Sequence, residues 1–224
     1  MYPLIKICGI TNIEDSIFCL ENGANAIGFV GYSKSPRFIS PESLTKIINE
    51  CKNNFRTARF VAVLVSPDIS LIKDYILAGA NTLQIHSHES INFSYISLIK
   101  ENFPDIKLWI SFNAHSQKPH NLNGIEALHY DSFDPRAIGG TGRLSDWQEA
   151  KKIKEEFNLP LILAGGLNHQ NISNAIQFVS PDGVDASSGL EISKGKKDKE
   201  KIKIFISSAI TAFKKYSENQ CSNL

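Results

Sequence analysis

The sequence predicts an α/β fold, a single-domain (β/α)8 TIM barrel, and three observations carry that prediction. Strand-like and helix-like segments alternate along all 224 residues, the strand-like runs number eight, and no linker divides the series. An open doubly wound sheet is the alternative, but it usually contains fewer strands. We therefore expect one barrel over residues 1–216, followed by a polar C-terminal tail at 217–224 that frays.

The first half of the chain contains four β-α units, and most of their helices carry a recognisable start signal. The first helix begins at a capping box, Thr11-Asn12-Ile13-Glu14, and stops at Gly23. The second has Pro41 at its first position, and the third follows Pro67-Asp68. The expected strands are 4–8, 26–30, 60–65 and 82–86, and the fourth helix is expected from about 90 to 102.

The second half continues the alternation with one gap. The fifth strand, 107–112, runs into 113–124, where the sequence gives no clear helix. A capping box at 145–148 opens the helix after the sixth strand, and Asn168 is expected to cap the helix after the seventh. The expected strands are 127–131, 161–164 and 183–186, followed by a basic loop and a last helix over 198–216.

Composition excludes several classes of function. Apolar residues make up 42% and charged residues 21%, and the net charge is +1, so no global field favours nucleic acid or an anionic membrane as a partner. The sequence shows no signal-peptide pattern and no apolar run of roughly 18 residues, so we expect a cytoplasmic protein. The four cysteines form no C-x-x-C pair, which predicts free thiols and no metal site.

Polar side chains gather on the inward face of several expected strands. In a strand, alternate side chains share one face, so Lys6 and Cys8 lie on one side and Ile7 on the other. Burying such groups is costly unless they are paired or face a ligand. A lone inward histidine is more often a satisfied core residue, but the same pattern on four strands favours a site. The inward polar residues are Lys6, Cys8, Gln84, His86, His129, Asp131, Asp185 and Ser187.

Glycine-rich loops follow the last three strands. The loops at 139–142, 165–166 and 187–189 place backbone N–H groups where barrels often hold a phosphate. Each loop alone is more often a turn requirement, but together they favour a phosphate site. The first loop is neither G-x-G-x-x-G nor a Walker sequence, which disfavours a dinucleotide or nucleoside triphosphate. The expected phosphate-binding residues are Gly165, Gly166, Asp185, Ser187, Ser188 and Gly189.

Two basic features have different interpretations. Arg37 follows the second strand, where a guanidinium suits a planar carboxylate, although a solvated surface arginine is equally consistent with the sequence. The lysines at 194, 196, 197, 199 and 201 are interpreted as a solvated face.

Six groups of segments, spread over nearly the whole chain, belong together in one order. They are Lys6-Ile7-Cys8-Gly9-Ile10-Thr11, Gly28-Phe29-Val30 to Lys34-Ser35-Pro36-Arg37, Gln84-Ile85-His86, Asp131-Ser132 with Gly139-Gly140-Thr141-Gly142 and Asp146-Trp147, Leu163-Ala164-Gly165-Gly166-Leu167-Asn168, and Gly183-Val184-Asp185-Ala186-Ser187-Ser188-Gly189-Leu190-Glu191. In sequence and in order they resemble the phosphoribosylanthranilate isomerase family of tryptophan biosynthesis, and a set of this length is more specific than any single motif.

The resemblance implies an Amadori rearrangement of N-(5'-phosphoribosyl)anthranilate to 1-(2-carboxyphenylamino)-1-deoxyribulose 5-phosphate, without a cofactor or a metal. It implies Asp131 as the acid that protonates the ring oxygen and Cys8 as the base that removes the C2 proton. Arg37 would hold the anthranilate carboxylate. The other substrate contacts implied are Lys6, Gln84, His86, Gly140, Thr141 and Gly142.

These two roles require shifted pKa values. With reference pKa values of about 3.9 for Asp and 8.5 for Cys, only about one Asp in a thousand is protonated at pH 7 and roughly 3% of Cys is thiolate. We therefore expect the site to raise the pKa of Asp131 and to favour the Cys8 thiolate, with Lys6 as a candidate for the second effect.

The chain departs from the family pattern in two places. Ser87-His88-Glu89 stands where the family usually has glycine and then an acidic residue, so the loop after the fourth strand is expected to differ in backbone shape. His129 precedes Asp131 in a run that is usually aliphatic, and the sequence offers no reason for a histidine to face inward there.

Alternative functions remain open from the sequence. One is a sibling sugar-phosphate isomerase or an indole-glycerol-phosphate synthase, although the latter calls for a catalytic lysine constellation that is not found. Another is a non-catalytic barrel that binds a sugar phosphate, against which the presence of both Cys8 and Asp131 argues. A small phosphorylated molecule is the expected partner, and the chain is expected to be a monomer or a homodimer.

Overall fold

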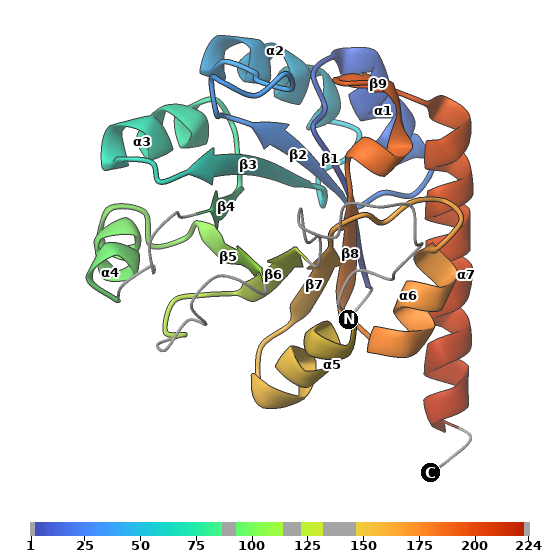
Figure 1. Ribbon diagram of the computed structural model, residues 1–224. Coiled ribbons are helices and arrows are strands. Elements are labelled where there is room, and N and C mark those ends of the chain that lie inside the picture. The colour runs from blue at the N-terminus through green and yellow to red at the C-terminus, as the bar shows by residue number, and fades with distance from the viewer. Residues whose placement is uncertain (1–2, 87–92, 114–121, 132–146, 222–224) are drawn as a thin grey trace.

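The computed structural model describes residues 3–86, 93–113, 122–131 and 147–221, and its eight parallel strands close into a barrel in sequence order (Figure 1). The prediction of a single-domain (β/α)8 barrel is thereby confirmed. The strands are β1 (Leu4–Cys8), β2 (Ala26–Val30), β3 (Arg59–Val65), β4 (Thr82–His86), β5 (Lys107–Asn113), β6 (Ala127–Asp131), β7 (Leu161–Ala164) and β8 (Gly183–Ala186).

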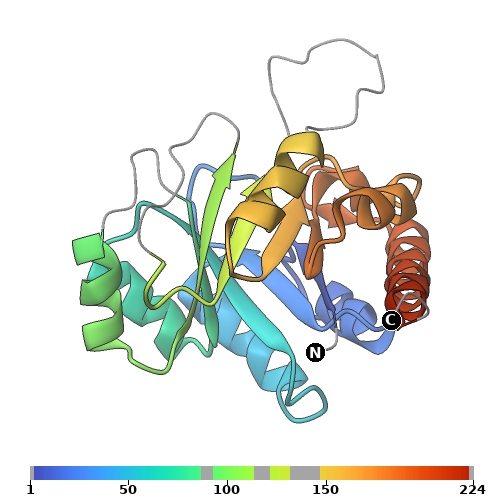
Figure 2. The same cartoon turned by 90° about the horizontal axis from the view of Figure 1, so that it is seen from below.

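Helices surround the barrel on its outer side. Figure 2, a view from below, places α7 on one side of the barrel and α4 on the other. No helix lies between β5 and β6 in the residues that the structure describes there, 107–113 and 122–131. The helices are α1 (Ile13–Glu21), α2 (Pro41–Cys51), α3 (Ile69–Leu77), α4 (Phe93–Asn102), α5 (Trp147–Glu156), α6 (Ile172–Val179) and α7 (Lys199–Cys221).

Helix starts agree with the sequence signals in the second and third units, shift by one residue in the first and differ in the seventh. The expected capping box was Thr11 with Glu14, but the side chain of Asn12 accepts a hydrogen bond from the Asp15 N–H at 2.7 Å and caps α1. Asn168 was expected to cap the helix after β7, but α6 begins four residues later, at Ile172. Asn168 instead accepts a hydrogen bond from the Gln170 N–H at 2.8 Å and so stabilises a turn in the loop before the helix.

The end of the chain also differs from the expectation. Helix α7 continues to Cys221, so the boundary placed between residues 216 and 217 comes five residues too early. Because α7 packs beside α6 and α1 (Figure 1), its last polar residues extend a helix that is already stabilised by packing.

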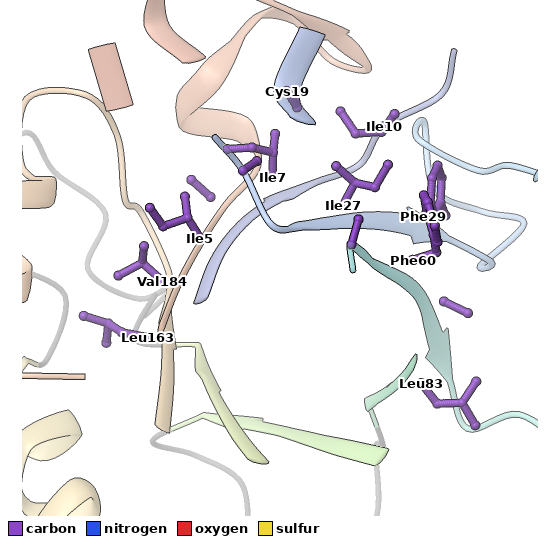
Figure 3. Close-up of a cluster of buried hydrophobic side chains, with 14 of the residues drawn as sticks. Ile5, Ile7, Ile10, Cys19, Ile27, Phe29, Phe60, Leu83, Leu163 and Val184 are labelled. Carbon is purple, nitrogen blue, oxygen red and sulfur yellow. The ribbon is translucent and has the colours of Figure 1, made fainter. Parts of the chain in front are cut away.

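The strand register separates two apolar layers. The larger layer lies between the strands and the helices, and Figure 3 shows side chains such as Ile7, Ile27 and Val184 on the outer side of the ring of strands. A smaller inner layer fills the barrel, with Trp109 and Ile162 among its members. Successive side chains of a strand point to opposite faces, so Lys6 and Cys8 point into the barrel while Ile5 and Ile7 point toward the helices.

A short hairpin follows β8 where a basic solvated loop was expected. A 3-10 turn over Ser188–Leu190 leads into β9 (Glu191–Ser193), which pairs antiparallel with β10 (Lys196–Lys197).

None of the described helices combines the length and the apolar character that a membrane span requires.

Candidate active site

The carboxyl ends of the strands surround a cavity of about 280 Å³. This is the end at which barrel enzymes place their active sites. The structure brings most of the residues singled out in the sequence to this one cavity, namely Cys8, Gln84, His86, Asp131, Gly165, Gly166, Asp185, Ser187, Ser188 and Gly189.

The remaining expected residues are not among those that line it. Gly140, Thr141 and Gly142 lie outside the described residues, and so does the departure at 87–89. Lys6 is fully buried beneath the cavity, and Arg37 stands beside it. His129, which the sequence placed on the inward face without a role, also lines the cavity. Residues that sequence reasoning did not assign to the site line it as well, namely Val63, Ala164, Leu167 and Ala186.

Lys6 and Asp185 form a buried ion pair across the β1–β8 register. The two residues are register partners, and Lys6 Nζ donates to Asp185 Oδ2 at 2.6 Å. Burial alone would raise the pKa of Asp185, but Lys6 and His129 lower it to about 2. Burial likewise opposes the charged form of Lys6, yet Asp185 and Cys8 raise its pKa above the ordinary value. Both groups are therefore ionised at neutral pH.

Cys8 shares a small space with Lys6 over Gly28 of β2. A Cβ atom on Gly28 would lie 2.8 Å from Cys8 Sγ and 3.1 Å from Lys6 Nζ, so only glycine leaves room for both groups. Burial raises the pKa of the Cys8 thiol, and the positive charges of Lys6 and Lys197 counter only part of that effect. Lys6 lowers the pKa of Cys8 in the expected direction, but the expectation that the site as a whole favours the thiolate is wrong, because burial of the thiol outweighs the nearby lysine.

Arg37 is held by a carboxylate that the sequence did not point to. Its Nε and Nη2 atoms donate to Glu191 Oε1 at 2.7 Å and Oε2 at 2.6 Å, in a two-point contact. Its stem packs against the backbone of Gly9, where an added Cβ would lie 2.5 Å from Arg37 Cδ and 3.0 Å from Ser187 Oγ. Arg37 is thus an oriented side chain next to the loop after β8, and not a freely solvated arginine.

Lys197 belongs to the same group of charges. Its Nζ donates to Glu191 Oε1 at 3.0 Å and to the Ser187 carbonyl at 3.1 Å, and its side chain is completely buried. The interpretation of this lysine as part of a solvated face was wrong, because the β9–β10 hairpin turns it inward while Lys194 and Lys196 stay exposed. It is a functional-site candidate that spacing alone could not reveal.

The loops after β7 and β8 lie against each other. A Cβ on Gly189 would lie 2.3 Å from the Leu167 carbonyl oxygen, so the contact between the loops requires glycine. Gly166 has a φ of +66° and open space where its side chain would be, which leaves its backbone accessible. Both features suit an anion held by main-chain N–H groups. Asp185 does not suit this role, because its ionised carboxylate repels phosphate, and we withdraw it from the phosphate contacts.

The arrangement suits proton transfer on a small anionic molecule. A thiol and a carboxyl group, Cys8 and Asp131, face one cavity whose rim carries glycine-rich loops and a nearby guanidinium. Within the described ranges, no group of three or more His, Cys, Asp or Glu side chains could hold a metal ion.

Comparisons with known proteins agree with this description. The family model of N-(5'-phosphoribosyl)anthranilate isomerase matches residues 5–208. The enzyme of that name from Thermotoga neapolitana is 39% identical over 214 residues, which cover 92% of this chain and 97% of the relative. The crystal structure of phosphoribosyl anthranilate isomerase from Thermotoga maritima superposes with a TM-score of 0.77 at 34% identity, covering 92% of this chain and 98% of that one.

A further solved structure carries a ligand. A phosphoribosyl anthranilate isomerase in complex with reduced 1-(o-carboxyphenylamino)-1-deoxyribulose 5-phosphate superposes with a TM-score of 0.74 at 33% identity, over 92% of this chain and 98% of that one.

Proposed function

Because this chain belongs to the N-(5'-phosphoribosyl)anthranilate isomerase family of tryptophan biosynthesis, we propose that Cys8 and Asp131 carry out the two proton transfers of its Amadori rearrangement. The observation that supports this most is the shared cavity, since a thiol from β1 and a carboxyl group from β6 line the same space as the glycine-rich loops.

The reaction needs an acid and a base in succession. In the first step Asp131 gives a proton to the ribose ring oxygen as the C1–O bond breaks, and the electron pair of the anilino nitrogen forms a C1=N iminium. In the second step Cys8 takes the proton from C2, and the C2–H electrons move to make a C1=C2 enolamine. Tautomerisation then puts a proton on C1 and a carbonyl at C2, which gives the product.

The raised pKa of the Cys8 thiol favours this order of steps. A thiol at the floor of the cavity is a poor base until a positive charge comes close to it. The iminium created by ring opening is such a charge, and it adds to Lys6, whose ammonium already lowers the pKa of Cys8. The Cys8 thiolate therefore forms more readily after ring opening, which is the step at which Cys8 must accept the proton from C2.

The glycine-rich loops and Arg37 supply binding. In this proposal the main-chain N–H groups of Gly166 and Gly189 bind the phosphate, which is supported by the open space beside Gly166 and the close contact between the two loops at Gly189. Arg37 keeps Nη1 outside its two-point contact with Glu191, and that atom can donate to the anthranilate carboxylate. Glu191 thus holds the guanidinium in one orientation.

The test is the decay of phosphoribosylanthranilate fluorescence with the purified protein and its variants. Cys8→Ser and Asp131→Asn should each lower kcat by about 10²–10⁴-fold with a small change in KM, because each removes a proton-transfer group. Cys51→Ser is the matched control, since Cys51 is buried in α2 and does not line the cavity. Near wild-type turnover in either site variant would remove that residue from its role.

A further inference from the structure

His129 is a buried imidazole that joins three strands at the floor of the cavity. The residue is 2% exposed, Nε2 lies 2.9 Å from Asp185 Oδ2, and Nδ1 lies 2.9 Å from Ser111 Oγ. Lys6 reaches the same Asp185 oxygen from the other side. A continuous chain of hydrogen bonds thus runs from β5 through β6 and β8 to β1, where Cys8 stands.

The ionised carboxylate of Asp185 determines which nitrogen of the His129 imidazole carries a hydrogen. Its carboxylate is ionised and can only accept, so His129 Nε2 carries a hydrogen and donates it. Two donors, Lys6 Nζ and His129 Nε2, therefore converge on one oxygen, Oδ2. The other oxygen, Oδ1, is buried and has no hydrogen-bond partner among the described residues.

An ionised carboxylate oxygen without a donor is expensive in a protein interior. Leaving a buried acceptor unpaired costs about 1–3 kcal/mol, and more when the group is charged. Asp185 lines the cavity, as does Gln84, whose Oε1 is also a buried acceptor for which the described residues provide no donor. Both atoms can accept and neither can donate in this arrangement, so the missing partner is a hydrogen-bond donor.

We propose that His129 is a positioning residue that, together with Lys6, pins Asp185 Oδ2 inside the barrel so that Oδ1 accepts a hydrogen bond from a sugar hydroxyl of the ligand. The phosphate and the carboxylate of the ligand cannot fill this role, because both are acceptors at neutral pH. The identity of the ligand as a sugar phosphate rests on the proposed function, but the placement of an acceptor by His129 does not.

The hydroxyl involved lies near the reacting carbon. Lys6 bonds to Asp185 and shares the space over Gly28 with Cys8, and the carboxylate is close enough to raise the pKa of the thiol. A group that binds at Oδ1 therefore sits beside the thiol that acts at C2. By sharing the charge of Asp185, His129 also reduces the repulsion between this carboxylate and a Cys8 thiolate.

The variants His129→Gln and His129→Asn both carry an amide side chain but differ in its length, so they test whether the donor at residue 129 must reach Asp185. In His129→Gln the side-chain amide nitrogen reaches about as far as Nε2 and can still donate to Asp185, whereas in His129→Asn it is too short. Binding is measured by calorimetry with two probes, ribose 5-phosphate and inorganic phosphate. We expect His129→Asn to weaken ribose 5-phosphate about tenfold while phosphate affinity stays within about twofold, and His129→Gln to stay near the wild type.

Several outcomes would overturn the proposal. Equal wild-type affinities for ribose 5-phosphate and phosphate would mean that no hydroxyl is bound. Unchanged ribose 5-phosphate binding in His129→Asn, or an equal loss of both probes, would remove His129 from the positioning role. If His129→Asn does not fold, Ser111→Ala, which frees the other side of the ring, should give a smaller loss confined to ribose 5-phosphate.

Reactivity of Cys8 gives a readout that does not depend on turnover. The rate of Cys8 alkylation by iodoacetamide, followed by peptide mass spectrometry across pH, should shift to higher pH in His129→Asn and not in His129→Gln. If the variants give these binding and alkylation results but the wild-type protein shows no isomerase turnover, the proposed function is contradicted and the positioning role of His129 is still supported.

Discussion

Two of the charged groups of the barrel, one near each end of its strands, differ in how completely their atoms are partnered. The carboxyl-end cluster consists of Lys6, Ser111, His129 and Asp185, and one oxygen of its carboxylate has no donor among the described residues. The amino-end cluster consists of Arg59, Lys107, Trp109 and Glu126. There both carboxylate oxygens are used, by Arg59 at 2.9 Å twice and by Trp109 Nε1 at 3.0 Å.

The two clusters also differ in burial. In the carboxyl-end cluster the side chains of Lys6 and Asp185 are 0% and 6% exposed, whereas those of Arg59 and Glu126 in the amino-end cluster are 32% and 29% exposed. Taking an ion pair out of water costs several kcal/mol, and apolar residues of similar volume often stabilise as well. Stability therefore explains the amino-end cluster, whose ion pair is about one-third exposed and whose carboxylate is fully partnered, but not the buried cluster.

The two ends of the barrel therefore use their charged side chains in different ways. At the amino ends of the strands, charges satisfy one another and hold β3 near β6. At the carboxyl ends, charges are buried at a cost, and Asp185 Oδ1 faces no donor within the described part of the chain. Variants at each end of the barrel test this difference.

Breaking the buried pair should have the largest effect on stability. Lys6→Met keeps most of the side-chain volume but leaves the Asp185 carboxylate buried without its cation, which should lower the free energy of unfolding by roughly 3–5 kcal/mol. The measurement is urea unfolding at neutral pH. The matched control is the double variant Lys6→Met with Asp185→Asn, which removes both charges and should recover a large part of the loss. A single variant as stable as the wild type would mean that the pair carries no charge in the folded protein.

The inward placement of the polar residues could be predicted from the sequence because it follows from strand alternation. Lys6, Cys8, Gln84 and Asp185 each alternate with apolar neighbours, and the closed barrel turns all of them to the inside. The glycine loops were likewise visible, since a strand end followed by glycine marks the same end of each unit.

Contacts between distant segments could not be predicted in this way. Glu191 lies 154 residues from Arg37, and nothing in local spacing indicates that it holds the guanidinium. In the sequence nothing distinguishes Lys197 from the exposed lysines beside it, and it is buried only because of the β9–β10 hairpin. His129 was recognised as inward, but its reason for being there depends on Ser111 and Asp185, which approach from two other strands.

The state of Cys8 shows a different limit. The sequence revealed a lysine on the same strand face, and that lysine does lower the pKa of the thiol. It did not reveal the depth of the thiol, and burial is the larger cause. A neighbouring charge can be read from alternation, whereas desolvation depends on everything that packs around the group.

Lowering the pH should remove the contribution of the ionised Asp185 carboxylate to the free energy of unfolding. Its pKa in the folded protein is lowered to about 2, below the unfolded value of about 3.9, so its contribution is present above pH ~4 and is lost as the pH falls toward about 2. The difference in unfolding free energy between the wild type and Asp185→Asn should therefore shrink by about 2 kcal/mol between about pH 7 and about pH 2. Urea titrations at both pH values measure it. A constant difference would show that the carboxylate is not held ionised by Lys6 and His129.

Neutralising the amino-end cluster should have the smallest effect, and on stability alone. Glu126→Gln removes the charge that Arg59 and Lys107 share and keeps an acceptor for Trp109, so we expect a loss of about 1 kcal/mol in unfolding free energy. Its kcat and KM for phosphoribosylanthranilate should match the wild type, because Glu126 does not line the cavity. Glu101→Gln, on the exposed face of α4, controls for the loss of one surface carboxylate. If Glu126→Gln lowers kcat while Glu101→Gln does not, the amino-end cluster also shapes the site, and the separation between the two ends of the barrel fails.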